Sequence, residues 1–177
     1  MRSSRLFHVL SRTTKRSSRP SRRLAVEMLE PRNLLSTISL LPAADNTLYE
    51  NPTGSLSNGL GQHLFAGATG QASNAIRRAM VKFDLSAVPA GSTINSATLT
   101  LTMSRTNDTA PRDTALHRLL ADWGEGTSVA GTGGNGEGAG APATTGDATW
   151  VHTFFNTQTW TNPGGDFVAD PSAVTTV

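Results

Sequence analysis

Few residues of this 177-residue chain have the types and spacing that catalysis requires. The chain has no cysteine, which excludes thiolate nucleophiles, cysteine-bound zinc and disulfides. Its four histidines are isolated in the sequence and form no H-E-x-x-H spacing: His8, His63, His117 and His152. Its carboxylates mostly adjoin turns, where aspartate bonds the local backbone, and no pair has a spacing that demands general acid and base roles. The sequence therefore predicts a protein that is not an enzyme.

Aromatic residues are the better candidates for a functional site. Trp150 and Trp160 flank the stretch "VHTFFNTQT". The C–H face of a sugar ring can stack on an indole while neighbouring amides or hydroxyls bond its hydroxyl groups. The alternative is that these residues belong to the core, because aromatic side chains dominate protein cores. We expect Trp150 and Trp160 to contact carbohydrate and Trp123 to be a core residue.

A structural calcium ion is the one cofactor that the sequence allows. Calcium prefers hard oxygen ligands, and the best carboxylate donors near the first expected strand are Asp45 and Glu50. The alternative is that both are ordinary turn and edge charges. No other cofactor is expected.

Period-two alternation predicts the strands that must position these residues. Apolar residues alternate with polar ones over residues 81–85 and again over 97–103, where the polar positions are threonines. Pro89 and Gly91 lie between the two runs and favour a turn. Further short strand-like segments are separated by turn formers, and "TALHRLLADW" is read as a strand, with a short helix as the alternative. The pattern indicates an all-β antiparallel sandwich or barrel.

One long segment lacks a strand pattern. Residues 124–147 are rich in glycine and are predicted to form a flexible loop or insertion. The run "GTGGNG" inside it matches G-x-G-x-x-G in form, but the sequence that follows cannot make the helix that a dinucleotide site needs.

Charge is distributed unevenly along the chain, whose pI is about 9.7. Residues 1–32 carry nine Lys or Arg and two acids, a net charge of +7, which leaves −5 for the remainder. We therefore expect a disordered basic arm over residues 1–36 and an acidic domain over residues 37–177 that binds no nucleic acid. No run of about 20 apolar residues is present, so no membrane span is expected.

The end of the arm resembles a known motif. The run "VEMLEPRNLLS" is similar to the LEPR-XLL motif of large bacterial surface and secreted proteins, through Leu29, Glu30, Pro31, Arg32, Leu34 and Leu35. The resemblance implies a sorting or export role, with the export or sorting machinery as partner.

A wider resemblance covers the domain. The segments "PAADNTLYE", "RRAMVKFDLSAVPAGSTINSATLTLTM", "DWGEGT", "GDATW" and "TWTNPGGDF" resemble in order the DNRLRE domain, which is related to carbohydrate-binding module family 96 and to disaggregatase-related domains. The resemblance implies a jelly-roll β-sandwich of an extracellular protein. Members continue with further strands where this sequence ends at "PSAVTTV", so we expect a C-terminally truncated, incomplete domain.

The sequence thus predicts a non-catalytic extracellular or cell-surface module that binds polysaccharide. One alternative is a purely structural spacer or adhesion domain of a large surface protein. A second is a fragment of a polysaccharide-degrading enzyme. Exposed indoles would favour the first reading, and buried indoles would favour the spacer.

Overall fold

The computed structural model describes residues 36–131 and 136–177. The chain divides into two units, Met1–Ser36 and Thr37–Val177. The predicted disordered arm and the sorting motif, from Leu29 to Leu35, lie outside the described residues.

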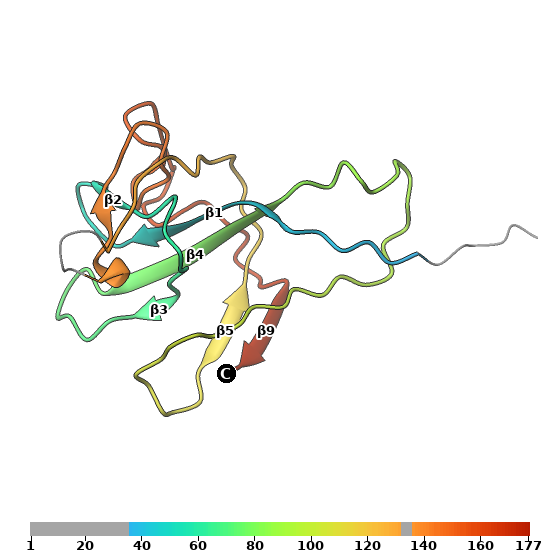
Figure 1. Ribbon diagram of the computed structural model, residues 1–177, viewed down its shortest axis with the longest axis horizontal. Coiled ribbons are helices and arrows are strands. Elements are labelled where there is room, and N and C mark those ends of the chain that lie inside the picture. The colour runs from blue at the N-terminus through green and yellow to red at the C-terminus, as the bar shows by residue number, and fades with distance from the viewer. Residues whose placement is uncertain (1–35, 132–135) are drawn as a thin grey trace, which may run out of the picture. The chain divides into compact units, whose positions relative to one another are not determined.

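The main sheet has three antiparallel strands in the order β1-β4-β3 (Figure 1). Their bounds are β1 Pro42–Tyr49, β3 Gly67–Ala68 and β4 Ile76–Phe83. The first alternating run predicted in the sequence forms the end of β4, with Val81 and Phe83 half-buried. The last four residues of β1, Asn46 to Tyr49, are all buried, so both faces of this strand end are covered.

Three further antiparallel pairs of short strands complete the fold. The pairs are β2 Leu56–Ser57 with β6 Ala141–Pro142, β5 Asp113–Leu116 with β9 Ala173–Thr176, and β7 His152–Phe154 with β8 Gln158–Thr159. A single 3-10 turn, η1 Glu137–Ala139, interrupts the glycine-rich segment. The described residues contain no α-helix, and "TALHRLLADW" begins with β5 as a strand. The all-β fold is confirmed, while the jelly-roll sandwich stays a prediction.

The hydrophobic core lies against β1 and β4. Its buried members are Leu48, Met80, Trp123, Ala148 and Trp160. Burying a side chain such as leucine or methionine stabilises the fold by about 1.5 to 3 kcal/mol. The expectation that Trp123 is a core residue is confirmed, with 5% of its surface exposed.

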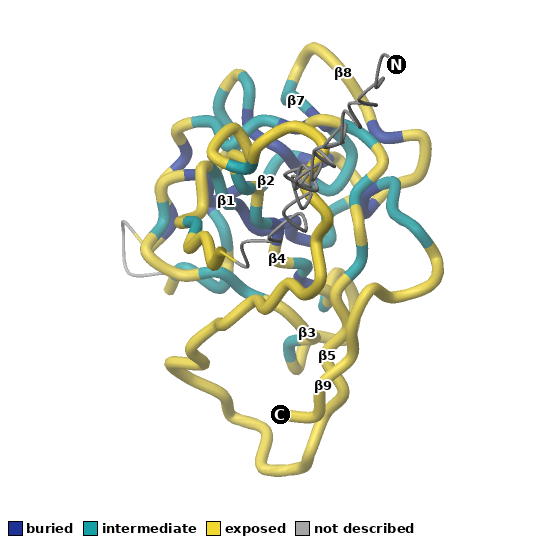
Figure 2. Tube along the Cα trace, turned by 90° about the vertical axis from the view of Figure 1, so that its right-hand side faces the viewer, coloured by how far each residue is buried: buried dark blue, intermediate teal, exposed yellow. Residues whose placement is uncertain are grey.

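The second alternating run does not form the predicted strand. Residues 93–105 are exposed throughout and make no hydrogen bond within the described part of the chain. They follow β4 in a long excursion away from the sheets (Figure 1), and Figure 2 shows this part of the chain as exposed. Alternation gives the tendency to extend, but a strand also needs a neighbour for its N–H and C=O groups. No described segment of the chain pairs with these residues to provide one.

The glycine-rich segment 124–147 is also unlike its prediction, because its described part is packed. Ser128, Ala130, Ala141 and Asp147 are all buried. A Cβ atom added at Gly126 would lie 1.6 Å from the Asp147 Oδ1 atom. Glycine therefore serves close packing here rather than flexibility.

Candidate functional site

Trp160 is buried and offers no surface to a sugar. Only 4% of it is exposed, and its indole Nε1 donates a hydrogen bond to the Thr149 carbonyl oxygen at 2.8 Å. Since the ring packs in the core and its single polar group is satisfied internally, the expectation that Trp160 contacts carbohydrate is corrected.

Trp150 is half-buried, and a cation covers its ring. The Arg78 guanidinium carbon lies 4.9 Å from the Trp150 ring centre and 5.0 Å from the Phe167 ring centre. Arg78 also donates through Nη1 to the Gly164 carbonyl oxygen at 2.5 Å. Burial lowers the pKa of the Arg78 guanidinium. The Trp150 ring is therefore engaged by internal partners, a cation–π arrangement that ties β4 to the turn at residues 162–165.

A hollow of ligand size lies on the described surface, away from the tryptophans that the sequence predicted as binding residues. Its volume is about 420 Å³, within the range of small-molecule sites, and it is lined by Leu120, Ala121, Thr161, Asn162, Gly165, Asp166 and Phe167. Neither Trp150 nor Trp160 belongs to this lining.

The polar side of the hollow is a tight turn held by Asp166. Its carboxylate accepts hydrogen bonds from the backbone N–H groups of Thr161 at 2.8 Å and Asn162 at 2.9 Å. Hydrogen bonds from these two amides lower the pKa of Asp166, and the bond from Thr161 has the larger effect. The polar residues Thr161, Asn162 and Asp166 thus line the hollow together with Phe167. Asp166 is one of the carboxylates expected at turns, whereas Asn162 and Phe167 were not predicted to belong to a site. The run "TNPGGDF", in which turn formers stand beside an acid and an aromatic residue, was the sequence signal for them.

The two predicted calcium ligands are not brought together. Glu50 accepts a hydrogen bond at Oε2 from the Ile76 amide at 2.9 Å, whereas Asp45 donates through its own amide to Glu125 Oε1 at 3.1 Å. The two residues are five positions apart along an extended chain, so their side chains leave opposite faces. Burial, and then the Glu125 charge, raise the pKa of Asp45. Within residues 36–131 and 136–177, no group of three or more His, Cys, Asp or Glu could hold a metal ion.

A buried amide that the sequence did not indicate organises the middle of the domain. Asn46 is fully buried, and its Nδ2 donates to the Ser57 hydroxyl at 2.9 Å and to the Glu125 carbonyl oxygen at 2.9 Å. Its Oδ1 accepts the amides of Thr47 at 2.7 Å and Asn58 at 3.2 Å. The side chain thus connects β1, β2 and the glycine-rich segment.

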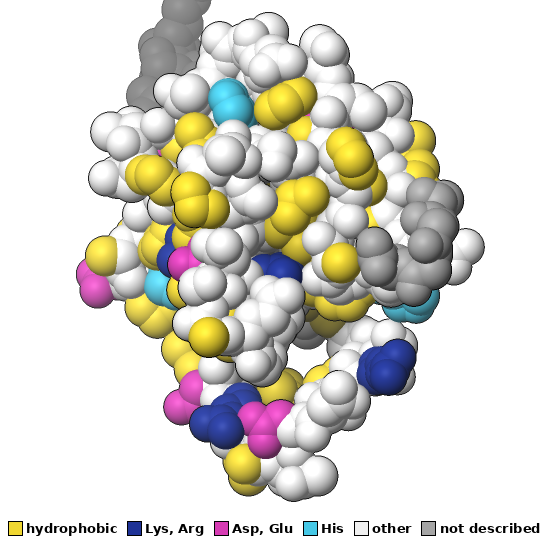
Figure 3. Space-filling view, turned by 90° about the vertical axis from the view of Figure 1, so that its left-hand side faces the viewer, with side chains coloured by type: hydrophobic (Ala, Val, Ile, Leu, Met, Phe, Trp, Pro, Cys, Tyr) yellow, Lys and Arg dark blue, Asp and Glu magenta, His cyan; other side chains and the backbone are white. Residues whose placement is uncertain are grey.

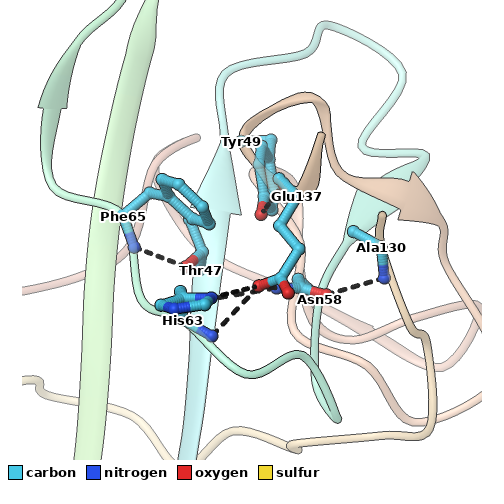
Figure 4. Close-up of polar contacts among 7 residues, drawn as sticks. All are labelled: Thr47, Tyr49, Asn58, His63, Phe65, Ala130 and Glu137. Atoms are coloured by element: carbon cyan, nitrogen blue, oxygen red, sulfur yellow. Dashed lines mark hydrogen bonds and ion pairs between the residues drawn. The ribbon is translucent and has the colours of Figure 1, made fainter. Parts of the chain in front are cut away.

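Glu137 attaches η1 to the main sheet (Figure 4). Its Oε2 accepts the His63 amide at 3.0 Å and lies 3.2 Å from His63 Nδ1, and its carbonyl oxygen accepts the Tyr49 hydroxyl at 2.8 Å. Arg77 stacks over the Tyr49 ring at 5.0 Å and donates through Nε to the Gly138 carbonyl oxygen at 3.1 Å. Burial raises the pKa of the Tyr49 hydroxyl. None of these residues lines the hollow, so the cluster fastens a loop.

Cations are sparse on the domain surface. Arg77 and Arg78 are turned inward, and Lys82 pairs with Asp122 at 2.6 Å. Figure 3 shows one face on which the Lys and Arg side chains lie in a few separate places, some of them beside acidic side chains. No helix in the described part of the chain is long and apolar enough to cross a membrane.

The fold and these contacts define the class of protein: an all-β module whose large aromatic and polar side chains are used mainly for internal contacts. Comparisons with protein-family models, curated proteins and solved structures find no match for the chain.

Proposed function

We propose that residues 37–177 are a non-catalytic structural module, a spacer or adhesion unit of an extracellular or cell-surface protein. The observation that carries this proposal is the state of the three tryptophans. Trp123 and Trp160 are buried, and the Trp150 ring is covered by Arg78. A module that holds polysaccharide on flat aromatic surfaces needs exposed rings, whereas the indoles of this chain contact the core or Arg78.

The non-catalytic part of the proposal is supported by the placement of the carboxylates. Asp45 and Glu125 are neighbours, but neither lines the hollow. Asp166 does line the hollow, but its carboxylate oxygens accept hydrogen bonds from backbone amides of the turn. A glycosidase needs two carboxylates flanking one bond, so the enzyme-fragment alternative has no support from this arrangement.

A polysaccharide pull-down tests the structural role. The full chain is mixed with insoluble polysaccharides of differing linkage and charge, and the unbound fraction is measured with and without calcium. We expect the chain to stay in solution in every case, as an unrelated non-binding protein of similar size does. Specific retention on any one polysaccharide would contradict the structural role.

Polysaccharide binding remains a second candidate, and one observation favours it. The hollow is lined by Thr161, Asn162 and Asp166, whose hydrogen-bonding groups suit the hydroxyls of a sugar, and by Phe167, whose ring, like that of Trp150, already carries Arg78 at 5.0 Å. If retention is found, Phe167→Ala should abolish it, whereas a change at the exposed Asn107, outside the hollow, should not. Retention that both variants keep would contradict binding in the hollow.

For the first unit we propose a sorting role through Leu29, Glu30, Pro31, Arg32, Leu34 and Leu35. The support is the LEPR-XLL resemblance and the basic residues before it. Replacing Glu30 and Arg32 with alanine should reduce the share of the protein that reaches the cell surface, measured by fractionation of the producing cells. Unchanged delivery would contradict the role.

A further inference from the structure

Residues 97–103 are an unpaired strand-forming segment. Leu99, Leu101 and Met103 are 38%, 63% and 61% exposed, and no described residue bonds to the backbone of this segment. Its threonines alternate with these apolar side chains, so an extended conformation puts the two kinds on opposite faces. The segment therefore has an apolar face, a threonine face and two backbone edges to which no described residue bonds.

The segment carries none of the features that keep exposed strands apart. Natural sheet edges are protected by charged residues, proline, bulges or a covering element. Residues 85–104 contain no charged residue, and residues 92–104 contain neither proline nor glycine. Two copies could approach here without charge repulsion, although the domain as a whole is acidic.

The side-chain pattern is symmetric about Thr100. In an antiparallel pair of two copies centred on Thr100, Leu99 lies opposite Leu101 of the second copy and Ala97 lies opposite Met103. Residues directly opposite share a face, so apolar side chains meet on one face and threonines on the other, both of which are favourable cross-strand pairs. A shift of the centre by one residue keeps the two faces but pairs unlike side chains at the end of the segment: a centre at Leu99 sets Met103 opposite Asn95, and a centre at Leu101 sets Ala97 opposite Arg105. A shift by half a residue would set Thr100 opposite Leu99 or Leu101, so that a polar and an apolar side chain meet.

We propose that residues 97–103 form an antiparallel strand pair with the same residues of a second copy, about a two-fold axis at Thr100. The partner of this surface is another copy of the chain. This inference goes beyond the proposed structural role and does not depend on it.

Cysteine crosslinking tests the axis directly, because the chain contains no cysteine of its own. Directly opposite residues of an antiparallel pair have Cα atoms about 4.5 to 5.5 Å apart, which a disulfide can span. The full chain with Thr100→Cys should form a disulfide-linked dimer under mild oxidation at least about tenfold faster than Asn107→Cys, since pairing raises the local thiol concentration. Asn107 is equally exposed but lies outside the segment. Equal rates for the two variants would overturn the proposal.

Charge substitution tests the register. In sedimentation velocity, Leu99→Lys with Leu101→Lys should raise the dimer dissociation constant at least about tenfold, because lysines meet lysines across the axis. Leu99→Glu with Leu101→Lys should restore dimerisation, since each glutamate then meets a lysine. Leu85→Lys, a change at a 62% exposed leucine outside the segment, should leave the constant unchanged.

Folding is checked in each variant through the emission of the buried indoles Trp123 and Trp160. A wild-type chain that stays monomeric at about 100 μM, a concentration suited to weak dimers of Kd near this value, would overturn the proposal. So would a Glu–Lys variant that dimerises no better than the double-lysine variant.

Discussion

The glycine-rich segment 124–147 and the threonine-rich segment 93–105 each pack in the way that the sequence of the other would predict. The first has no regular periodicity, yet Ser128, Ala130, Ala141 and Asp147 within it are buried. The second has a strict alternation, yet it is exposed throughout and makes no hydrogen bond in the described structure. Figure 2 shows the contrast between the buried region around β1 and the exposed chain near β5 and β9.

The difference teaches that periodicity and packing are separate properties. Alternation states which residues share a face once a strand forms, but pairing depends on a second segment. Glycine, which sequence reading treats as a sign of flexibility, also lets backbone approach side chains closely. In this protein the polar anchors, Asn46 and Glu137, hold the glycine-rich segment against β1. Among the residues that the structure describes, none anchors the alternating segment in this way.

Matched glycine substitutions should give the largest effect. Gly126 and Gly91 both have positive φ, +71° and +81°, but a Cβ at Gly126 collides with Asp147 whereas one at Gly91 meets nothing within 4 Å. Gly126→Ala should lower the free energy of unfolding by about 3 to 4 kcal/mol, as backbone strain and overpacking combine. Gly91→Ala should cost only about 1 kcal/mol, the backbone strain alone. Urea denaturation measures both, and similar losses for the two variants would mean that segment 124–147 is not packed in solution.

A pair of leucine truncations tests the same contrast, with a largest single loss somewhat below that at Gly126. Leu48 is 1% exposed in the core, whereas Leu101 is 63% exposed. Leu48→Ala should cost about 3 kcal/mol of unfolding free energy, because it leaves a cavity. Leu101→Ala should stay within about 0.5 kcal/mol of the wild type in dilute solution. A loss at Leu101 comparable to that at Leu48 would show that the alternating segment packs within its own domain.

Much of the fold could be predicted from sequence, and the errors have a common cause. The all-β class, β4 and the burial of Trp123 followed from local alternation and residue type. The packing of segment 124–147 did not, because it depends on distant contacts such as the bond from Asn46 Nδ2 to the Glu125 carbonyl oxygen. The unpaired segment 97–103 could not be foreseen for the same reason.

The candidate site was predicted less well than the fold. Indole chemistry identified Trp150 and Trp160 as binding residues, but whether an aromatic ring faces solvent is a tertiary property. The cation that covers Trp150 is the guanidinium of Arg78 on β4. Arg78 precedes Trp150 by 72 positions, and the sequence does not indicate that the two side chains are in contact. Asp45 and Glu50 lie five positions apart along an extended chain, and this spacing, which puts their side chains on opposite faces, could have been noticed in the sequence.

A buried hydroxyl offers a stabilising test within the packed region. The Thr153 Oγ1 atom is buried and has no hydrogen-bond partner in the described structure. Thr153→Val keeps the shape and removes the unsatisfied group, so it should raise the unfolding free energy by about 1 kcal/mol. The same change at the exposed Thr98 should have almost no effect. Equal responses in thermal denaturation would indicate that Thr153 is solvated.

The smallest expected effect is a pH dependence whose sign differs between the regions. Burial and the Glu125 charge raise the pKa of Asp45 above its ordinary value of 3.8, so the folded state binds this proton more tightly than the unfolded state. Ionised Asp45 therefore costs stability, and the unfolding free energy falls as pH rises from 3.8 through the raised pKa. Asp45→Asn should stabilise the domain at neutral pH, by less than about 1 kcal/mol because the group is mostly solvated.

Asp84, which begins the exposed excursion, provides the opposite case. Hydrogen bonds from Ser86 lower the pKa of Asp84, and the bond from the amide has a larger effect than the bond from the hydroxyl. The contribution of ionised Asp84 to stability is therefore present above pH 3.8 and is lost as pH falls through the lowered pKa. Asp84→Asn should therefore lower stability at neutral pH, while Asp45→Asn raises it and loses its advantage below pH 3.8. Urea denaturation of both variants between pH 3 and 7 checks the signs. Matching signs would mean that Asp45 is not buried beside Glu125 in solution, which would contradict the contact between β1 and the glycine-rich segment.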